Sequence, residues 1–412
     1  MGSNLTFVIH NYTTIINIHM GNPYSKERRK MAERNKVELY LKDVFERECV
    51  YKIEREEVEF IQTGIETIVQ RIANKVLDND TLQESMKIKF AKYFKGKLIR
   101  SPINIFGVGS FYEETRNNFP DEFDFILTLF CCEGTFEEYK QFLLEASVFN
   151  TVADTFSQKV KELSELDKDA LLYTAPDPKC ARKLYFDKYL RQHGPATWLR
   201  FIYESKSKRK KEIDVDYVAA LHITDRNVLN QIVNESCVLT EFAQETLSVG
   251  SCFCIGANFS LTQTEVHIMR NVLSEKHRQI YRILKYLING HGDVEKLDNL
   301  GNFDKPYSSY MIKTVMIYHH FNCKTFDTVN FGPCILDVLG DLCRYKNTSE
   351  FPSLYKLDYR TKIRCDLCLL TFLRTLTDSL RSMQRLLGSS YDYERDKVKE
   401  SISKKYLDTL GK

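Results

Sequence analysis

The sequence predicts an α+β protein with two lobes: a mixed β-sheet lobe that carries a long N-terminal helix, and an α-helical C-terminal lobe. Residues from about 36 to 77 read as helix, because apolar residues recur there at spacings of three and four. Strand-like runs broken by turn residues follow at 103–130, 195–205 and 212–221. After about residue 246 the apolar pattern becomes mostly helical again.

These patterns divide the chain into three segments. We expect a flexible basic leader at 1–35, a core with the long helix and the sheet at 36–245, and a helical lobe at 246–412. With 43% apolar and 28% charged residues, the composition is ordinary for a folded protein and excludes wholesale disorder. No apolar run approaches the roughly 20 residues that span a bilayer. The twelve irregularly spaced cysteines are typical of reduced thiols in a cytoplasmic protein.

Positive charge is clustered, although the net charge is only +3. Segments 26–36 and 87–100 hold six basic residues each, and segment 206–211 holds five. Basic stripes on a nearly neutral protein are compatible with nucleic-acid binding by one face. A solvated helix surface is the alternative, and charge alone favours it slightly.

Acidic residues alternate with apolar ones in two of the predicted strands. Glu122 and Asp124 are two residues apart, so both point to the same face of a strand. Asp214 and Asp216 alternate in the same way, and either could complete a group of three. Because neighbouring carboxylates resist joint ionisation, we expect a divalent cation such as Mg²⁺ to bind between them.

A Gly-Ser pair precedes these acids. Ser110, which follows Gly109, lies twelve and fourteen residues before Glu122 and Asp124, and such a turn offers backbone N–H groups and a hydroxyl to phosphates. Three carboxylates around two metal ions can hold a triphosphate and activate an attacking hydroxyl. Each part is common by itself, but the combination at this spacing is the signature of a nucleotidyltransferase.

The segment "GSFYEETRNNFPDEFDFIL" resembles the active-site segment of cyclic GMP-AMP synthase and the animal cGAS-like receptors. The similarity continues in "GPATWLRFIYES", "IDVDYVAAL", "FSLTQTEVHIM", "RILKYLI" and "SSYMIKTVM", and covers about residues 45–320. It implies a bilobal nucleotidyltransferase fold with a long spine helix. It further implies an enzyme with two Mg²⁺ or Mn²⁺ ions that joins ATP and GTP into a cyclic dinucleotide when nucleic acid binds to the spine.

The resemblance also implies roles for individual residues. Glu122, Asp124 and Asp216, rather than Asp214, would hold the ions as the catalytic triad. Ser110, next to Gly109, would contact the donor triphosphate. The remaining nucleotide contacts would come from Lys285 at the phosphates and from Ser309 and Tyr310 at a nucleobase.

Two basic groups match the family's nucleic-acid surface. Lys52 and Arg55 would lie one turn apart on the spine helix. Segment 206–211 occupies the place of the family's activation loop, and we expect double-stranded RNA to order this loop and align the metal site. The residues of that loop implied to bind nucleic acid are Lys206, Lys208, Arg209 and Lys210.

The vertebrate enzyme carries a zinc-binding insertion with a His and three Cys, and this chain departs from it at that place. The equivalent segment here, "RNVLSEKHRQIY", has one His and no Cys, so we expect no zinc. Cys365 and Cys368 form a lone CxxC pair, and His320 and Cys323 are further candidate ligands, but core cysteines are the favoured interpretation. Family members without the insertion include sensors of double-stranded RNA and makers of 3′2′-linked cGAMP, which favours RNA over DNA as the activator.

A second departure is Asn258, which replaces an arginine at the base pocket of the vertebrate enzyme. An amide offers fewer donors than a guanidinium, so base preference and phosphodiester linkage stay open. The alternatives are a nucleotidyltransferase with a linear product and a catalytically inactive scaffold, and the intact triad favours catalysis.

The N-terminus matches a lipidation pattern in two places. Gly2 with Thr6, or Gly21 with Ser25 if translation starts at Met20, fits N-myristoylation. Such short patterns are often accidental, so we expect membrane contact only if one of the glycines is modified.

Overall fold

The computed structural model describes most of the chain outside the N- and C-terminal segments. The described ranges are 36–77, 104–144, 171–175, 181–193, 196–256, 258–289, 309–324, 330–348, 351–354 and 367–385, with short pieces within 84–99 and 154–165. The predicted leader and both candidate myristoylation sites lie outside these ranges. Among the described residues, no helix combines the length and the apolar character that crossing a bilayer requires.

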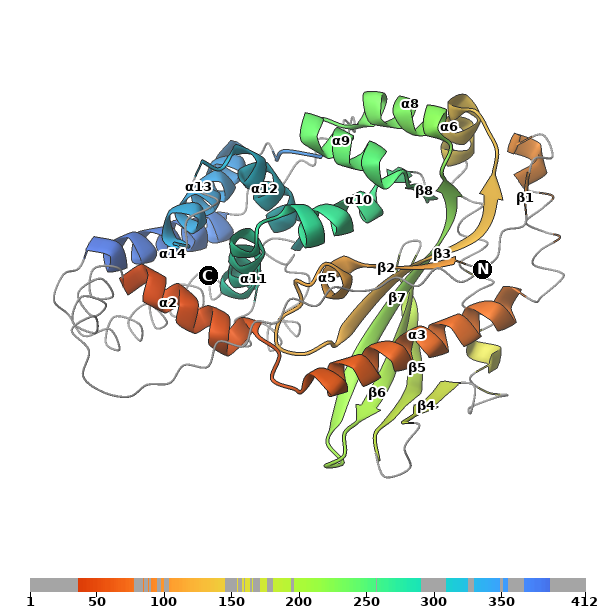
Figure 1. Ribbon diagram of the computed structural model, residues 1–412, viewed down its shortest axis with the longest axis horizontal. Coiled ribbons are helices and arrows are strands. Elements are labelled where there is room, and N and C mark those ends of the chain that lie inside the picture. The colour runs from red at the N-terminus through yellow and green to blue at the C-terminus, as the bar shows by residue number, and fades with distance from the viewer. Residues whose placement is uncertain are drawn as a thin grey trace.

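A mixed sheet of nine described strands forms one part of the molecule (Figure 1). Its main path runs β1-β3-β7-β6-β5-β4, with β2 paired to β3, β8 to β7 and β9 to β8. The pair β3–β7 is parallel, and the other described pairs are antiparallel. The strands are β1 (Leu98–Ile99), β2 (Asn104–Val108), β3 (Glu122–Cys132), β4 (Leu172–Thr174), β5 (Lys183–His193), β6 (Ala196–Glu204), β7 (Lys210–Ile223), β8 (Cys252–Ile255) and β9 (Asn258–Ser260).

Helices lie on the sheet and also form a separate group. Figure 1 shows α2 and α11 to α14 gathered at the end of the molecule away from β4. The predicted α+β class is confirmed, although β8 and β9 extend the sheet beyond the predicted boundary at residue 245. The described helices are α2 (Lys36–Val44), η1 (Phe45–Cys49), α3 (Arg55–Leu77), α5 (Gly109–Tyr112), α6 (Phe136–Leu144), α8 (Arg226–Ser236), α9 (Thr240–Val249), α10 (Thr262–His267), η3 (Ile268–Val272), α11 (Glu275–Asn289), α12 (Ser309–Asn322), α13 (Gly332–Thr348) and α14 (Leu367–Arg385).

The predicted long N-terminal helix is interrupted. α2 and η1 end at Cys49, and α3 begins at Arg55. The apolar stripe of α3 is buried as predicted, since Ile61, Ile65 and Ile68 are all 0% exposed. Burial of each such side chain contributes about 1.5–3 kcal/mol, so α3 is held firmly on the sheet, whereas residues 50–54 form a break in the helix.

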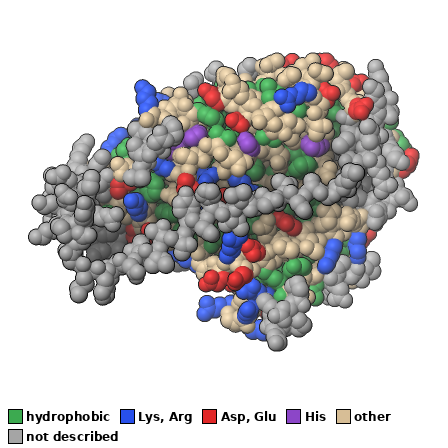
Figure 2. All heavy atoms as spheres, in the orientation of Figure 1, with side chains coloured by type: hydrophobic (Ala, Val, Ile, Leu, Met, Phe, Trp, Pro, Cys, Tyr) green, Lys and Arg blue, Asp and Glu red, His purple; other side chains and the backbone are tan. Residues whose placement is uncertain are grey.

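A tight basic hairpin connects the end of β6 to the start of β7. The Ser205 N–H donates to the Arg209 carbonyl over 2.9 Å, and Lys208 adopts a positive φ of 62°. Figure 2 shows Lys and Arg side chains gathered, with acidic ones among them, at the end of the molecule where Figure 1 places this hairpin. The segment expected to be a loop that RNA must order is therefore already a closed turn.

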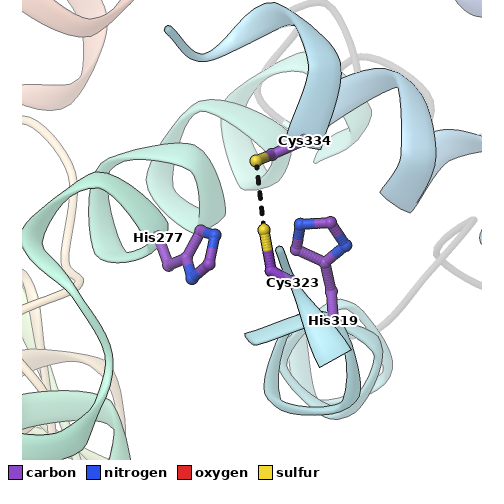
Figure 3. Close-up of side chains that lie close together, drawn as sticks. All are labelled: His277, His319, Cys323 and Cys334. Carbon is purple, nitrogen blue, oxygen red and sulfur yellow. Dashed lines mark hydrogen bonds between the residues drawn. The ribbon is translucent and has the colours of Figure 1, made fainter. Parts of the chain in front are cut away.

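Four potential metal ligands meet where α11, α12 and α13 pack together. Figure 3 shows His277, His319, Cys323 and Cys334 converging from these helices. Of these four residues, the sequence indicated only Cys323 as a candidate ligand, paired with the neighbouring His320, because it gives no sign that residues so far apart would meet. Of the lone CxxC pair, Cys365 and the side chain of Cys368 lie outside the described residues.

A buried ion network connects α12 to α10 and to the residue that follows α5. Lys313 Nζ lies 2.8 Å from Glu113, which directly follows α5, and 2.6 Å from Glu265 of α10. Burial lowers the pKa of Lys313, but the Glu113 and Glu265 carboxylates raise it by more. The pKa of Lys313 therefore lies well above its usual value. Lys313 therefore stays charged and holds the two acids together.

Replacing Lys313 with alanine leaves two buried carboxylates without their counter-charge, so we expect the Lys313→Ala variant to lose about 3–5 kcal/mol of unfolding free energy. The matched control is Arg344→Ala, which breaks an exposed pair with Asp341 and costs less than about 1 kcal/mol. Guanidinium chloride unfolding measures both. Equal losses in the two variants contradict the interpretation.

Candidate active site

The three predicted triad acids lie on the parallel strands β3 and β7. Asp124 and Asp216 are register partners, and Glu122 lies two residues before Asp124. Each of the three offers a carboxylate oxygen, and these oxygens all lie within 4.8 Å of one another. Because alternate residues of a strand share a face, the parallel register alone brings the three side chains together.

Asp214 lies near the same face but has a different partner. Its register partner on β6 is Arg200, whose Nε donates to Asp214 Oδ1 over 2.8 Å. The strand pattern left the choice between Asp214 and Asp216 open, and the family resemblance favoured Asp216. In the structure Asp216 joins the other two acids, whereas Asp214 pairs with arginine.

The close approach changes the acidity of Asp124. Burial raises its pKa well above the usual value, and the neighbouring charges of Glu122 and Asp216 raise it further. A bound divalent cation would reverse this effect by stabilising the ionised form. The donor set consists of carboxylate oxygens, which are the ligands that Mg²⁺ and Mn²⁺ prefer, so the residues fit the predicted metal ions.

Gly109 packs directly against the triad. Its φ is +75°, which favours glycine, and a Cβ added there would overlap the Oδ2 atom of Asp124. Glycine is therefore required at this position for two reasons: the positive φ of the turn, and the space that the Asp124 carboxylate occupies. Ser110 follows as the second residue of α5.

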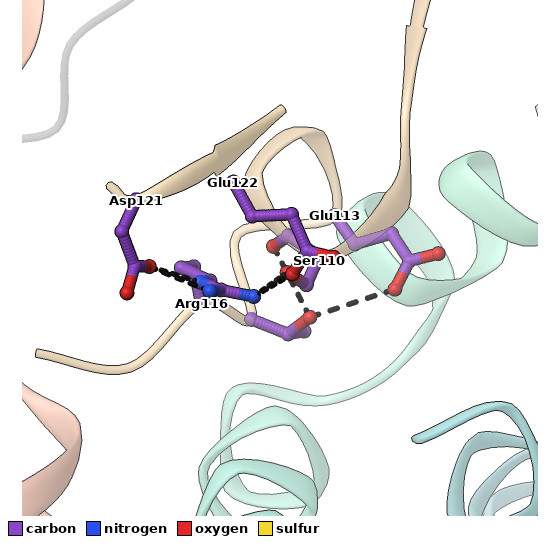
Figure 4. Close-up of polar contacts among 6 residues, drawn as sticks. Ser110, Glu113, Arg116, Asp121 and Glu122 are labelled. Atoms are coloured by element: carbon purple, nitrogen blue, oxygen red, sulfur yellow. Dashed lines mark hydrogen bonds and ion pairs between the residues drawn. The ribbon is translucent and has the colours of Figure 1, made fainter. Parts of the chain in front are cut away.

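Arg116 contacts the triad and was not predicted from the sequence. Its guanidinium donates to Glu122, to Asp121 over 2.6 Å, and to the Ser110 hydroxyl over 3.4 Å (Figure 4). Arg116 therefore competes with a metal ion for Glu122. It offsets only one of the three carboxylate charges, so the group retains net negative charge for a divalent cation.

The loop that carries Arg116 turns back on itself. Glu114 and Asn118 both have positive φ, at 59° and 60°. This reversal returns Arg116 to the start of β3, although the sequence places it six residues before Glu122. Asn is enriched at positive φ but Glu is not, so the sequence gives only a weak signal for this reversal, and Arg116 was missed.

The predicted nucleotide-binding residues of the helical part lie on α11 and α12. Lys285 is 9% exposed; burial and the charge of Arg116 lower its pKa to about 8, against the opposing effect of Glu113 and Glu122. Tyr310 is 41% exposed, and Lys313 Nζ lies 5.6 Å from the centroid of its ring. Ser309 begins α12, and its carbonyl accepts a hydrogen bond from Tyr281 over 3.1 Å. Their contacts with nucleotides remain predictions.

The two basic spine residues are arranged differently from the expectation. Lys52 lies in the break before α3, and Arg55 is the first residue of that helix, so the two are not one turn apart on a continuous helix. The Lys52 side chain donates to the Glu46 carbonyl over 3.0 Å, and its backbone N–H donates to Asn118 over 3.1 Å. The Arg55 side chain is 76% exposed and pairs with Glu59.

No protein-family model matches the sequence, and no curated protein matches it either. Among solved structures, the chain is similar to CdnC of E. coli MS115-1 in a complex with HORMA-deltaN, at 12% identity and a TM-score of 0.39 over 83% of this chain and 96% of that chain. It is also similar to the same CdnC with ATP, at 11% identity and a TM-score of 0.37 over 82% and 96% of the two chains. Both likenesses are weak, so the site is interpreted below from its own residues.

A methyl group at Gly109 would displace the Asp124 carboxylate, so we expect Gly109→Ala to weaken Mn²⁺ binding at least about tenfold, as is common when the support of a ligand is lost. Gly340→Ala is the matched control, because nothing lies within 4 Å of a Cβ built at that helical position. Electron paramagnetic resonance of free Mn²⁺ measures both affinities. Unchanged Mn²⁺ affinity in Gly109→Ala would show that Asp124 takes no part in the site.

Proposed function

We propose that this protein is a nucleotidyltransferase that makes a cyclic dinucleotide from ATP and GTP by two-metal phosphoryl transfer. The observation that carries the proposal is the convergence of Glu122, Asp124 and Asp216 beside the Gly109–Ser110 turn. Phosphoryl transfer needs positioning and charge neutralisation more than covalent chemistry, and this arrangement offers both.

Each residue of the site has a distinct part in the proposed reaction. Glu122, Asp124 and Asp216 would hold the ions, which supply charge neutralisation for the triphosphate and lower the pKa of the attacking hydroxyl. Ser110 offers its hydroxyl to the donor triphosphate. Lys285, with a pKa of about 8, is mostly protonated at neutral pH and would pair with phosphate oxygens.

The proposed product is a cGAMP-type molecule with a 3′2′ linkage. Tyr310, which is 41% exposed, would stack on a nucleobase. Asn258, exposed at the start of β9, would replace the bidentate contact of an arginine with a single amide, which changes the preference for base or ribose hydroxyl. We propose that the product acts on a cyclic-dinucleotide receptor in the cytoplasm as part of antiviral innate immunity.

Double-stranded RNA is the proposed activator, in preference to DNA. Exposed basic residues at the helix break and at the β6–β7 hairpin could contact phosphates across an RNA minor groove. The break also contacts the active-site loop, because the Lys52 N–H donates to the Asn118 carbonyl and Arg282 contacts both Cys49 and Asn117. A ligand at the break would thereby shift the loop that carries Arg116.

We propose that RNA bound at the helix break moves Arg116 away from Glu122. The hairpin between β6 and β7 does not need to be ordered by RNA. A cavity of about 380 Å³, lined by Arg116, Tyr51 and Arg282 among others, offers room for the guanidinium beside the site. Removal of Arg116 from Glu122 would leave all three carboxylates available to metal ions.

The reaction is tested by incubating the protein with ATP, GTP and Mg²⁺ or Mn²⁺, with long duplex RNA, duplex DNA or no nucleic acid, and separating products by chromatography. We expect a nuclease-resistant cyclic product with RNA. Asp216→Asn should reduce the rate at least about 100-fold, because a metal ligand is lost. Asp214→Asn, on the same strand but paired with Arg200, should stay within about fivefold of the wild type.

The outcomes separate the competing functions. A linear, nuclease-sensitive product would identify a different nucleotidyltransferase. Unchanged nucleotide pools under every condition would indicate an inactive scaffold and contradict the proposal.

Reversing the charge of the helix break should remove activation without disturbing the fold. We expect the double variant Lys52→Glu, Arg55→Glu to lose RNA stimulation at least about tenfold, because several phosphate contacts are lost together, while its melting temperature stays that of the wild type. Arg344→Glu, an exposed charge reversal on α13, is the control. RNA stimulation that persists in the double variant would place the RNA surface elsewhere.

A further inference from the structure

A second group of metal-ligand side chains lies in the helical part. It contains His277 of α11, His319 of α12, Cys323 immediately after α12, and Cys334 of α13 (Figure 3). One ligand atom of each residue lies within 4.8 Å of those of the other three. The group contains two nitrogen and two sulfur donors, a set that is typical of tetrahedral zinc.

The spacing of the two sulfur atoms matches a shared metal ion. Cys323 Sγ and Cys334 Sγ are 3.7 Å apart. This separation is far longer than a disulfide bond of about 2.05 Å. Two thiolates at about 2.3 Å from one tetrahedral Zn²⁺ are about 3.8 Å apart, so the sulfurs already have the separation that one zinc ion would impose.

The two histidines present a nitrogen toward the group. The Nε2 atoms of His277 and His319 are buried and have no hydrogen-bond partner among the described residues. The other ring nitrogen of His277, Nδ1, lies 2.7 Å from Nδ1 of His320, and this hydrogen bond fixes the orientation of the His277 ring.

We propose that His277, His319, Cys323 and Cys334 bind one structural Zn²⁺ ion. Four protein ligands leave no open coordination position, which distinguishes a structural from a catalytic zinc site. Two thiolates balance the charge of Zn²⁺, so the complete site is neutral and suits its buried surroundings. The expectation of no zinc was based on a missing insertion, whereas this site is assembled from three separate helices.

The zinc ion would cross-link the helices that carry the predicted nucleotide-binding residues. α11 bears Lys285, and α12 bears Ser309, Tyr310 and the Lys313 ion network. A cross-link at the far ends of these helices would restrict their relative movement. The proposal does not depend on the proposed enzymatic activity, since metal content can be measured directly.

Metal analysis of the full chain, purified without chelators, tests the proposal. We expect about one zinc per chain in the wild type. The double variant Cys323→Ser, Cys334→Ser should contain less than about 0.1 zinc per chain, because both thiolates are lost. Cys343→Ser, which removes a thiol of the same helix α13 outside the group, should retain about one zinc.

A spectroscopic measurement covers the case in which the double variant fails to fold. Wild-type protein stripped of metal with a chelator should bind Co²⁺ and show the intense visible bands of tetrahedral cobalt with thiolate charge transfer. Absence of both zinc and cobalt binding in the wild type overturns the proposal, as does full zinc retention in a folded double variant. A Cys323–Cys334 disulfide found by mass spectrometry under non-reducing conditions overturns it equally.

Discussion

Repulsion between three carboxylates on adjacent parallel strands is the constraint on which the candidate active site depends. The register of β3 and β7 fixes Asp124 opposite Asp216, and both strands are anchored by buried apolar residues on their other face, such as Phe123 and Val215. The acids therefore cannot separate without disrupting the sheet. Their joint charge is relieved by cations or by a proton on Asp124, whose pKa is raised, and the surroundings of the triad reflect that requirement.

The positive groups around the triad come from different parts of the chain. Arg116 arrives from the loop before β3, and Lys285 arrives from α11. Lys313 holds Glu113, at the end of the glycine turn, against α10 and α12. The helical part thus contributes to the electrostatics of a site built on the sheet, and its rigidity affects the site. A zinc ion joining α11, α12 and α13 would contribute to that rigidity.

Regular patterns made part of this structure predictable. Period-two alternation identified the faces of Glu122, Asp124 and Asp216, and the helical stripe identified the buried face of α3. The patterns could not identify features created by chain reversal or by distant packing. Arg116 reaches Glu122 through a loop in which Glu114 and Asn118 both adopt positive φ.

The second metal-ligand group was missed for a related reason. His319 and His320 are spaced four and three residues from Cys323, and both spacings place residues on one helix face, so nothing in the spacing corrected the choice of His320 over His319. His277 joins the group only through the packing of α11 on α12, which no local pattern encodes.

The most direct measurement of the central claim is anomalous X-ray diffraction from crystals of the protein grown with duplex RNA, Mn²⁺ and a non-hydrolysable ATP analogue. We expect anomalous peaks within about 2.5 Å of carboxylate oxygens of Asp124 and Asp216, the usual range for a metal–oxygen bond, with Arg116 displaced from Glu122. Manganese absent from the triad, with Arg116 still bound to Glu122 while the nucleotide occupies another part of the molecule, would contradict the account.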